Sequence, residues 1–297
     1  MSRSDDSISA CLTRIFWDKK VQKLNGDKRY PRVEYSSRDA TVTIYTALST
    51  LHANAADVLQ MCIFNGVRAA LDSHGKGELG NRFRGVRDRT CNTVHNELRE
   101  SVKIPDAGLV YRKPGSKATF TVVIEVGVSE SCHRLKADVN VWMQDFRCRT
   151  VILFLLKEQP KFKCPRKAAM RAYVADDGDT FDNAIYQVRD NQPFGPYLYN
   201  THSWFGTLDT AFVEIYRRDP NTGVITQPNR KGRSYGADNA NLGLIVDDLF
   251  PSNEEHIEDI HSEPIYLKTR MVEEFLGDGA VETARSRFFH ALGKRSH

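Results

Sequence analysis

The sequence contains no apolar segment long enough to cross a membrane. Its longest uninterrupted apolar run, Val151 to Leu156, has six residues, whereas a transmembrane helix needs about 20. The first six residues, Met1 to Asp6, are polar and include no apolar signal region. We therefore expect a soluble intracellular protein, located in the nucleus or the cytoplasm, with no membrane partner.

Paired cysteines and phosphate-binding glycine motifs are also missing. The six cysteines are widely separated and no two of them form a C-x-x-C pair, which argues against a structural zinc site, whose ligands come in close pairs. We expect reduced, mostly structural cysteines, because disulfide sets are typical of secreted proteins. The segment Gly75-Lys76-Gly77 does not predict a phosphate loop, because the sequence has no G-x-x-x-x-G-K-[ST] motif.

The composition is typical of a folded protein, with 40% hydrophobic and 27% charged residues. These fractions exclude a largely disordered, collagen-like or coiled-coil chain. A chain of 297 residues can form one elaborated domain or two small ones. We predict three parts: an N-terminal arm and helical elaboration in residues 1–80, an α/β core in 81–220, and an acidic segment with a C-terminal helix in 221–297.

The formal net charge of +4 is unevenly distributed. Residues 81–171 hold 19 basic and 9 acidic side chains, whereas residues 172–297 hold 12 basic and 20 acidic ones. A concentrated basic region favours a polyanion as partner, because phosphate contacts supply most non-specific affinity for nucleic acids. Two alternatives stay open: a solvated basic face, and a scaffold protein whose acidic segment binds a partner.

Hydrophobic periodicity predicts the order of elements along the chain. Residues 1–40 are polar and predict an irregular arm with one short helix. The expected helices are 41–71, 90–101, 131–147 and 281–292. The expected strands are 104–111, 120–128, 150–156, 172–174 and 208–216, with turns at 113–116 and 220–223 and an exposed acidic segment at 247–263.

One intensely apolar strand contains a single ionisable residue, Glu125, between Ile124 and Val126. Burying a lone carboxylate is costly unless it is paired or binds a metal ion. Asp106 lies nineteen residues earlier and falls opposite Glu125 if the two strands form a hairpin. Two converging carboxylates suit Mg²⁺, which prefers oxygen ligands. The alternative is that Glu125 faces solvent or pairs with an arginine.

These residues carry a resemblance to a known family. Pro105-Asp106, then Glu125-Val126-Gly127 in an apolar strand, then an amphipathic helix and a further strand, resembles the PD-(D/E)XK nuclease superfamily, which includes the restriction-endonuclease-like enzymes. The resemblance covers about residues 90–158. It implies an α/β fold with a restriction-endonuclease-like core, α-β-β-α-β with a mixed sheet, elaborated at both ends. Uncharacterised members of the superfamily share further residues after the catalytic strand: Val128-Ser129-Glu130-Ser131, Leu135, Asp138 and Trp142.

The resemblance also implies residue roles. Asp106, Glu125 and the backbone carbonyl of Val126 would hold Mg²⁺ or Mn²⁺, and Glu97 would be an auxiliary acid. The implied activity is metal-dependent hydrolysis of phosphodiester bonds, in DNA in the first place. The expected partner is nucleic acid, joined by a second copy of the chain if the protein is a homodimer.

The chain departs from the motif at Gly127, where the family has a lysine that assists the attacking water. Lys136, on the following helix, is the first candidate for a replacement cation and Arg134 the second; the alternative for Lys136 is an ordinary solvent-exposed lysine. If neither reaches the carboxylates, the fold would be a catalytically inactive module that binds nucleic acid or a protein. The residues expected to contact nucleic acid are Arg82, Arg84, Arg87 and Arg134.

Overall fold

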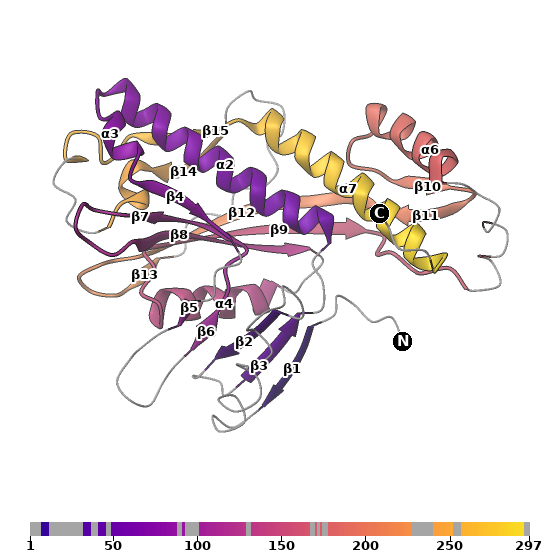
Figure 1. The fold of residues 1–297 in the computed structure, drawn as a ribbon, viewed down its shortest axis with the longest axis horizontal. Coiled ribbons are helices and arrows are strands. Elements are labelled where there is room, and N and C mark those ends of the chain that lie inside the picture. Colours follow the sequence, from indigo (N-terminus) through magenta and orange to yellow (C-terminus); the bar gives the residue numbers. More distant parts are fainter. Residues whose placement is uncertain are drawn as a thin grey trace.

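The computed structural model describes residues 7–11, 32–36, 41–45, 49–87, 91–92, 101–128, 132–166, 170, 173, 178–226, 240–251 and 257–293. These residues form a mixed α/β fold in which helices cover both faces of a curled central sheet (Figure 1). The α/β class predicted from the sequence is therefore confirmed.

The central sheet has six strands in the order β13-β12-β9-β8-β7-β4. Strands β8 and β9 are parallel, and the other neighbouring pairs are antiparallel. Both central strands are almost continuously apolar, as expected for strands that are covered on both faces. Their bounds are β4 Phe83–Val86, β7 Ala107–Tyr111, β8 Thr119–Val128, β9 Thr150–Gln159, β12 Thr207–Arg218 and β13 Ile225–Thr226.

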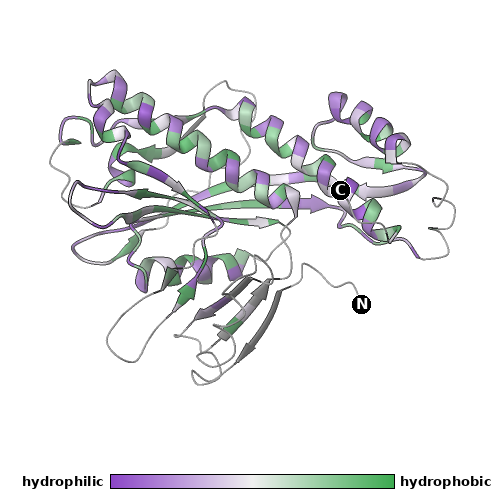
Figure 2. Ribbon diagram, in the orientation of Figure 1, coloured by the Kyte–Doolittle hydropathy of each residue, from purple (hydrophilic) through white to green (hydrophobic). Residues whose placement is uncertain are grey.

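Two long helices, α2 Thr50–Ser73 and α7 Thr269–Ala291, cover one face of this sheet, and α4 Cys132–Gln144 covers the other (Figure 1). Helix α2 begins after Ser49, whose Oγ accepts the backbone N–H of His52 at 3.2 Å and so caps the helix. Figure 2 shows hydrophobic residues on the central strands and on the helix surfaces turned toward them.

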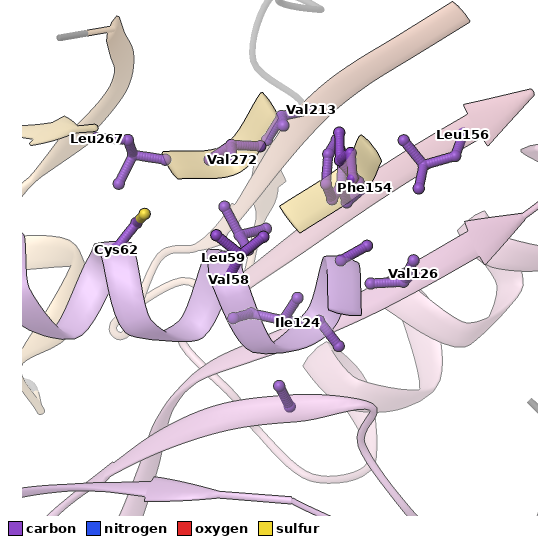
Figure 3. Packing of buried hydrophobic residues seen from close by; sticks show 14 of the residues in the cluster. Val58, Leu59, Cys62, Ile124, Val126, Phe154, Leu156, Val213, Leu267 and Val272 are labelled. Carbon is purple, nitrogen blue, oxygen red and sulfur yellow. The ribbon is translucent and has the colours of Figure 1, made fainter. Parts of the chain in front are cut away.

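The larger hydrophobic core lies between the sheet and the α2–α7 pair. Val58 and Leu59 of α2 point toward Ile124 of β8, with Phe154 of β9 close by (Figure 3). Members of this core run from Leu51 to Phe288 along the chain, so all three predicted parts contribute to it. A smaller core on the opposite face joins the sheet to the apolar stripe of α4: Leu135, Val139 and Trp142.

A second sheet of five short antiparallel strands lies on the α4 side of the molecule (Figure 1). The predicted irregular arm therefore contains strands, and the helix expected from residue 41 begins only at Thr50. The helix expected over 90–101 begins instead with two strand residues, and 93–100 lie outside the described residues. The strands are β1 Ser7–Cys11, β2 Arg32–Ser36, β3 Thr41–Tyr45, β5 Cys91–Asn92 and β6 Val102–Lys103.

The C-terminal part differs from the prediction in two places. Helix α7 begins at Thr269, twelve residues before the expected start. The acidic segment begins with a 3-10 helix, η4 Val246–Leu249, in which Asp247 pairs with Arg149 and Asp248 lies 2.6 Å from the Arg217 Nε. Since these acids are ion-paired within the chain, the start of the segment is part of the fold rather than an exposed linker.

The remaining elements are short or were not predicted. The hairpin turn expected at 220–223 is confirmed by the pairing of β12 with β13, whereas Tyr173 alone of the strand expected at 172–174 is described. None of the helices in the described ranges is long and apolar enough to span a bilayer. The other elements are α3 Gly77–Gly80, α6 Gly178–Asn191, β10 Tyr197–Tyr199, β11 His202–Phe205, β14 Ala240–Ile245 and β15 Pro264–Leu267.

Candidate functional site

The pairing of β7 with β8 brings the two predicted metal ligands together. Ala107 is paired with Ile124, so Asp106 and Glu125 are the next residues along the two strands. Asp106 Oδ2 accepts the backbone N–H of Val126 at 2.8 Å, and the exposed fractions of Asp106 and Glu125 are 8% and 4%. The hairpin thus places the two acids at adjacent backbone positions on neighbouring strands, where both are buried.

A histidine of α2 also reaches this carboxylate pair, which we define as Asp106 and Glu125. The Nε2 of His52 lies 3.1 Å from Asp106 Oδ1. His52 is itself buried and lies in the first turn of α2, just after the Ser49 cap. The helix start therefore positions a titratable ring beside Asp106, a contact that the sequence did not predict.

Glu125 points to the opposite face of the sheet, toward α4. Its Oε1 accepts the indole N–H of Trp142. Trp142 is fully buried, and its ring centroid lies 4.6 Å from that of Phe146 and 6.3 Å from that of Phe120. Glu125 is therefore not the solvent-facing residue that one interpretation of the sequence allowed.

The place of the motif lysine is filled by a leucine of α4. A Cβ atom on Gly127 would overlap the side chain of Leu135, so α4 packs directly on the strand backbone here. The Lys136 Nζ lies 4.0 Å from the carboxylate of Glu214 on β12, a buried acid that also accepts the Tyr216 hydroxyl at 2.7 Å. Lys136 thus contacts Glu214, whereas it was predicted to approach Asp106 and Glu125.

The other predicted residues are placed as follows. Arg134 lies one turn before Asp138 on α4, where its charge acts to lower the pKa of Asp138. The Val126 side chain points into the α2 side of the core (Figure 3), while its backbone touches Asp106. Glu97 lies outside the described residues.

A buried cluster that the sequence did not predict, the Lys103 cluster, is made of Glu34, Lys103 and Asp138. The Lys103 Nζ lies 2.7 Å from Glu34 Oε2 and 2.5 Å from Asp138 Oδ1. Glu34 Oε1 also accepts the backbone N–H of Ile104 at 3.3 Å. The sequence does contain an indication that these two charges are buried. Lys103 and Glu34 are each flanked by apolar residues on both sides, which is unusual for exposed charges.

The Lys103 cluster joins three distant segments and carries more acid than base. Glu34 comes from β2, Lys103 from β6 and Asp138 from α4. Burial raises the pKa of Asp138 above its ordinary value; Lys103 opposes that rise and Glu34 adds to it. The cluster holds a buried ammonium three residues before Asp106.

The carboxylate pair has the donor chemistry of a hard-cation site. Within the described ranges, no three His, Cys, Asp or Glu side chains are grouped closely enough to hold a metal ion. Mg²⁺, however, is usually bound through only one or two carboxylates, together with waters and substrate phosphates. Asp106, Glu125 and the Val126 carbonyl offer oxygen ligands of this type, but the Asp106 carboxylate contacts His52 of α2 and the Glu125 carboxylate contacts Trp142 of α4, on the opposite face of the sheet.

A basic surface, the arginine edge, follows the outer strand of the central sheet. We define it as Arg82, Arg84, Arg87 and Arg112, which line a surface pocket of about 470 Å³ beside β4 and β7. Phe83 between them is fully buried, so it cannot stack on a base. The arginine edge therefore offers guanidinium groups but no aromatic ring for base stacking.

Contacts within the protein hold the arginine edge in place. Arg82 Nη1 donates to the Tyr111 hydroxyl at 3.1 Å, and Arg84 Nη1 donates to the Phe83 carbonyl at 2.7 Å. Arg87 pairs with Asp57 of α2. Arg84 and Arg87 nevertheless remain exposed, because these contacts use only part of each guanidinium.

No protein-family model matches the chain, and no curated protein matches it either.

Proposed function

We propose that this protein is a metal-dependent nuclease that hydrolyses phosphodiester bonds, with DNA as its first expected substrate. The observation that carries the proposal is the juxtaposition of Asp106 and Glu125 on neighbouring strands, joined through the Asp106–Val126 hydrogen bond. Both acids are almost completely buried, and burying a carboxylate is costly unless it is paired or binds a cation. A bound divalent cation would offset part of that cost.

The order of elements supports the finer proposal of a restriction-endonuclease-like core. Helix α2 is followed by the antiparallel strands β4, β7 and β8, then by α4, and then by β9 parallel to β8. From β7 onward this order agrees with the hairpin strands, helix and parallel strand that the resemblance implies, whereas its first helix was expected at 90–101 and α2 lies earlier in the chain, at Thr50–Ser73. The carboxylate pair lies at the hairpin, as in the motif.

Each group of residues would have a separate task. Asp106, Glu125 and the Val126 carbonyl would hold Mg²⁺ or Mn²⁺, which when bound activates water and neutralises charge on the scissile phosphate. The arginine edge would hold the nucleic-acid backbone, because guanidinium groups match phosphate oxygens in a two-pronged geometry.

We propose Lys103 as the cation that would act in place of the missing motif lysine. Its Cα lies within about 11 Å of that of Asp106, since three peptide units separate them, and its ammonium is already buried among acids. A cation held in a water-poor site stabilises developing negative charge more strongly than one in water. The Lys136 side chain, by contrast, is 38% exposed.

The test is cleavage of plasmid and single-stranded DNA with Mg²⁺ or Mn²⁺ and with EDTA. We expect cleavage by the wild type with either metal, no cleavage with EDTA, and none by Asp106→Asn or Glu125→Gln. Glu214→Gln is the matched control, because Glu214 is an equally buried strand carboxylate outside the pair. Full activity of both pair variants would place the active site elsewhere.

One observation favours a second candidate, an inactive module of the same fold that binds nucleic acid or a protein. The Leu135 side chain occupies the position of the motif lysine, and each acid of the pair already accepts an N–H from the protein. DNA binding without cleavage at any metal concentration supports this candidate.

A further inference from the structure

We infer that the basic surface at the edge of the central sheet binds double-stranded nucleic acid through its phosphates, and that this surface continues past the arginine edge onto the turn between β7 and β8. The inference rests on the nucleic-acid-binding part of the proposed function and is independent of the metal site. Two surface hollows carry it. The first, of about 470 Å³, includes the whole arginine edge in its lining. The second, of about 510 Å³, is lined by Arg112, Gly115, Ser116, Lys117 and Ala118.

The two hollows adjoin, because Arg112 and Ala118 line both of them. We call their combined lining the basic track. No acidic side chain is among the described residues that line it. Arg87 pairs with Asp57 of α2, whereas within the described ranges neither Arg112 nor Lys117 pairs with an acid. The cations of the basic track are Arg82, Arg84, Arg87, Arg112 and Lys117.

Strand alternation explains why the basic track is cationic but not aromatic. Successive side chains of a strand point to opposite faces of the sheet. Phe83 and Tyr111 are paired across β4 and β7 and are buried on the α2 side, where their rings contact that of Phe250. Their neighbours Arg84 and Arg112 are exposed. The two strands thus keep their aromatic rings in the core and turn guanidinium groups outward.

This chemistry distinguishes between the forms of nucleic acid. Proteins that bind single strands combine a basic groove with aromatic rings on which the exposed bases stack. A duplex keeps its bases stacked inside and presents its phosphates to the solvent, so cations alone hold it without reading its sequence. No aromatic residue is among the described residues that line either hollow. The basic track therefore fits the backbone of a double helix better than a single strand.

The length of the basic track also suits a duplex. The Arg112 N–H donates to the Arg82 carbonyl at 3.2 Å, so these two residues lie opposite each other at one end of β4. Arg87 follows the other end of β4, five residues after Arg82, which corresponds to about 17 Å of strand. A duplex carries a phosphate on each strand every ~3.4 Å of its axis. One duplex can therefore contact the whole edge, and the turn with Lys117 extends that contact.

The experiment measures binding in EDTA, where metal-dependent cleavage is absent. Fluorescence anisotropy compares a DNA duplex, each of its strands alone, and a polyglutamate peptide of equal charge. We expect the duplex to bind about tenfold or more tightly than either strand, and polyglutamate to bind more weakly than the duplex. The slope of the logarithm of the binding constant against the logarithm of the salt concentration should be about −4.5, which is about −0.9 for each of five phosphate contacts.

The double variant Arg112→Ala/Lys117→Ala tests the extension onto the turn. Both side chains are exposed, so the fold should persist. Losing two phosphate contacts should make the salt slope shallower by about two and weaken duplex binding by about 10- to 100-fold at about 0.1 M salt. The matched control, Lys157→Ala/Arg270→Ala, removes the same charge from exposed positions on β9 and α7. It should bind the duplex as the wild type does.

The outcomes separate this inference from the nuclease proposal. Single strands or polyglutamate that bind as tightly as the duplex overturn the inference of a duplex partner. A double variant that behaves like the control overturns the extension onto the turn. Absence of binding to any nucleic acid overturns both the inference and the proposed function. Duplex binding with the expected slope but no cleavage in Mg²⁺ or Mn²⁺ supports the inference and contradicts the nuclease proposal alone.

Discussion

At the residue scale, Gly127 explains why the sequence motif and the three-dimensional site differ. The Leu135 side chain packs where a side chain at 127 would project, and tight packing of this kind tolerates no added volume without strain. A lysine here would have to displace α4 from the sheet. The chain instead keeps a buried lysine at position 103, on the other side of Asp106 in the sequence.

The first prediction separates the two candidate lysines. We expect Lys136→Met to leave the cleavage rate near that of the wild type, because Lys136 contacts Glu214. Lys103→Met should lower cleavage by about 10²- to 10³-fold, the usual effect of removing one charge-stabilising group. Single-turnover cleavage assays measure both rates.

A control is needed, because removing one partner of a buried ion pair costs about 3–5 kcal/mol. The double variant Lys103→Met/Asp138→Asn removes the cation and one acid together and keeps the net charge of the cluster. If this variant folds and cleaves DNA at the wild-type rate, Lys103 has no part in the reaction.

The second prediction concerns the pH dependence of stability. Burial raises the pKa of Asp138, so the folded protein holds this proton more tightly than the unfolded chain does. The stabilisation from this group is complete below the unfolded pKa and is lost as the pH rises through the folded pKa. The wild type should therefore lose more stability than Asp138→Asn between acid and neutral pH.

Urea denaturation of both proteins over that pH range measures the difference. The free energy of unfolding of Asp138→Asn, relative to that of the wild type, should increase with pH. A constant difference would mean that folding leaves the Asp138 pKa unchanged, and a difference that decreases with pH would mean that the ion pair with Lys103 lowers it; either result contradicts the prediction.

At the element scale, the strength of the local pattern decided which elements could be predicted. Strands β7, β8 and β9 and helix α4 were predicted because β8 and β9 have continuous apolar runs and the α4 stripe repeats at helical spacing. Strand β3, Thr41–Tyr45, was predicted as the start of a helix, because this short segment directly precedes the helical pattern of α2. Strand formation there depends on β1 and β2.

The same reasoning explains what the sequence revealed of the site. Asp106 and Glu125 were predicted to be neighbours because Glu125 is the single ionisable residue of an apolar strand. A hairpin with the preceding strand then puts Asp106 opposite it. The Lys103 cluster depends on the pairing of Tyr35 with Val102, two residues far apart in the chain. No local periodicity encodes such a contact, so the cluster could be found only in the structure.

The third prediction concerns the arginine edge on β4. Replacing Arg82, Arg84 and Arg87 together by alanine should weaken binding to any duplex sequence. The slope of the logarithm of the binding constant against the logarithm of the salt concentration should become shallower by about one for each lost phosphate contact. Fluorescence anisotropy in EDTA at several salt concentrations measures binding separately from cleavage.

The control for the arginine edge is Arg270→Ala, at an exposed arginine on α7 that pairs with Glu274. This variant should bind DNA as the wild type does. If the triple variant keeps the wild-type salt slope, phosphates are bound by another surface.

At the scale of the whole molecule, one core and an uneven charge distribution support the same function. The core runs through the sheet and both long helices, so the carboxylate pair lies on a rigid framework rather than on loops. The basic excess lies in residues 81–171, the segment that contributes the arginine edge, Lys103 and both metal-binding candidates. The residues proposed to act in catalysis and in binding thus come from one stretch of chain.

The most direct test of the central claim, that Asp106 and Glu125 together bind a divalent metal ion, is a crystal structure with Mn²⁺ recorded at a wavelength where manganese scatters anomalously. We predict one anomalous peak about 2.1 Å from an oxygen of each carboxylate, and none in Glu125→Gln. A wild-type crystal without a peak at the pair, or a peak that persists unchanged in Glu125→Gln, would contradict the claim.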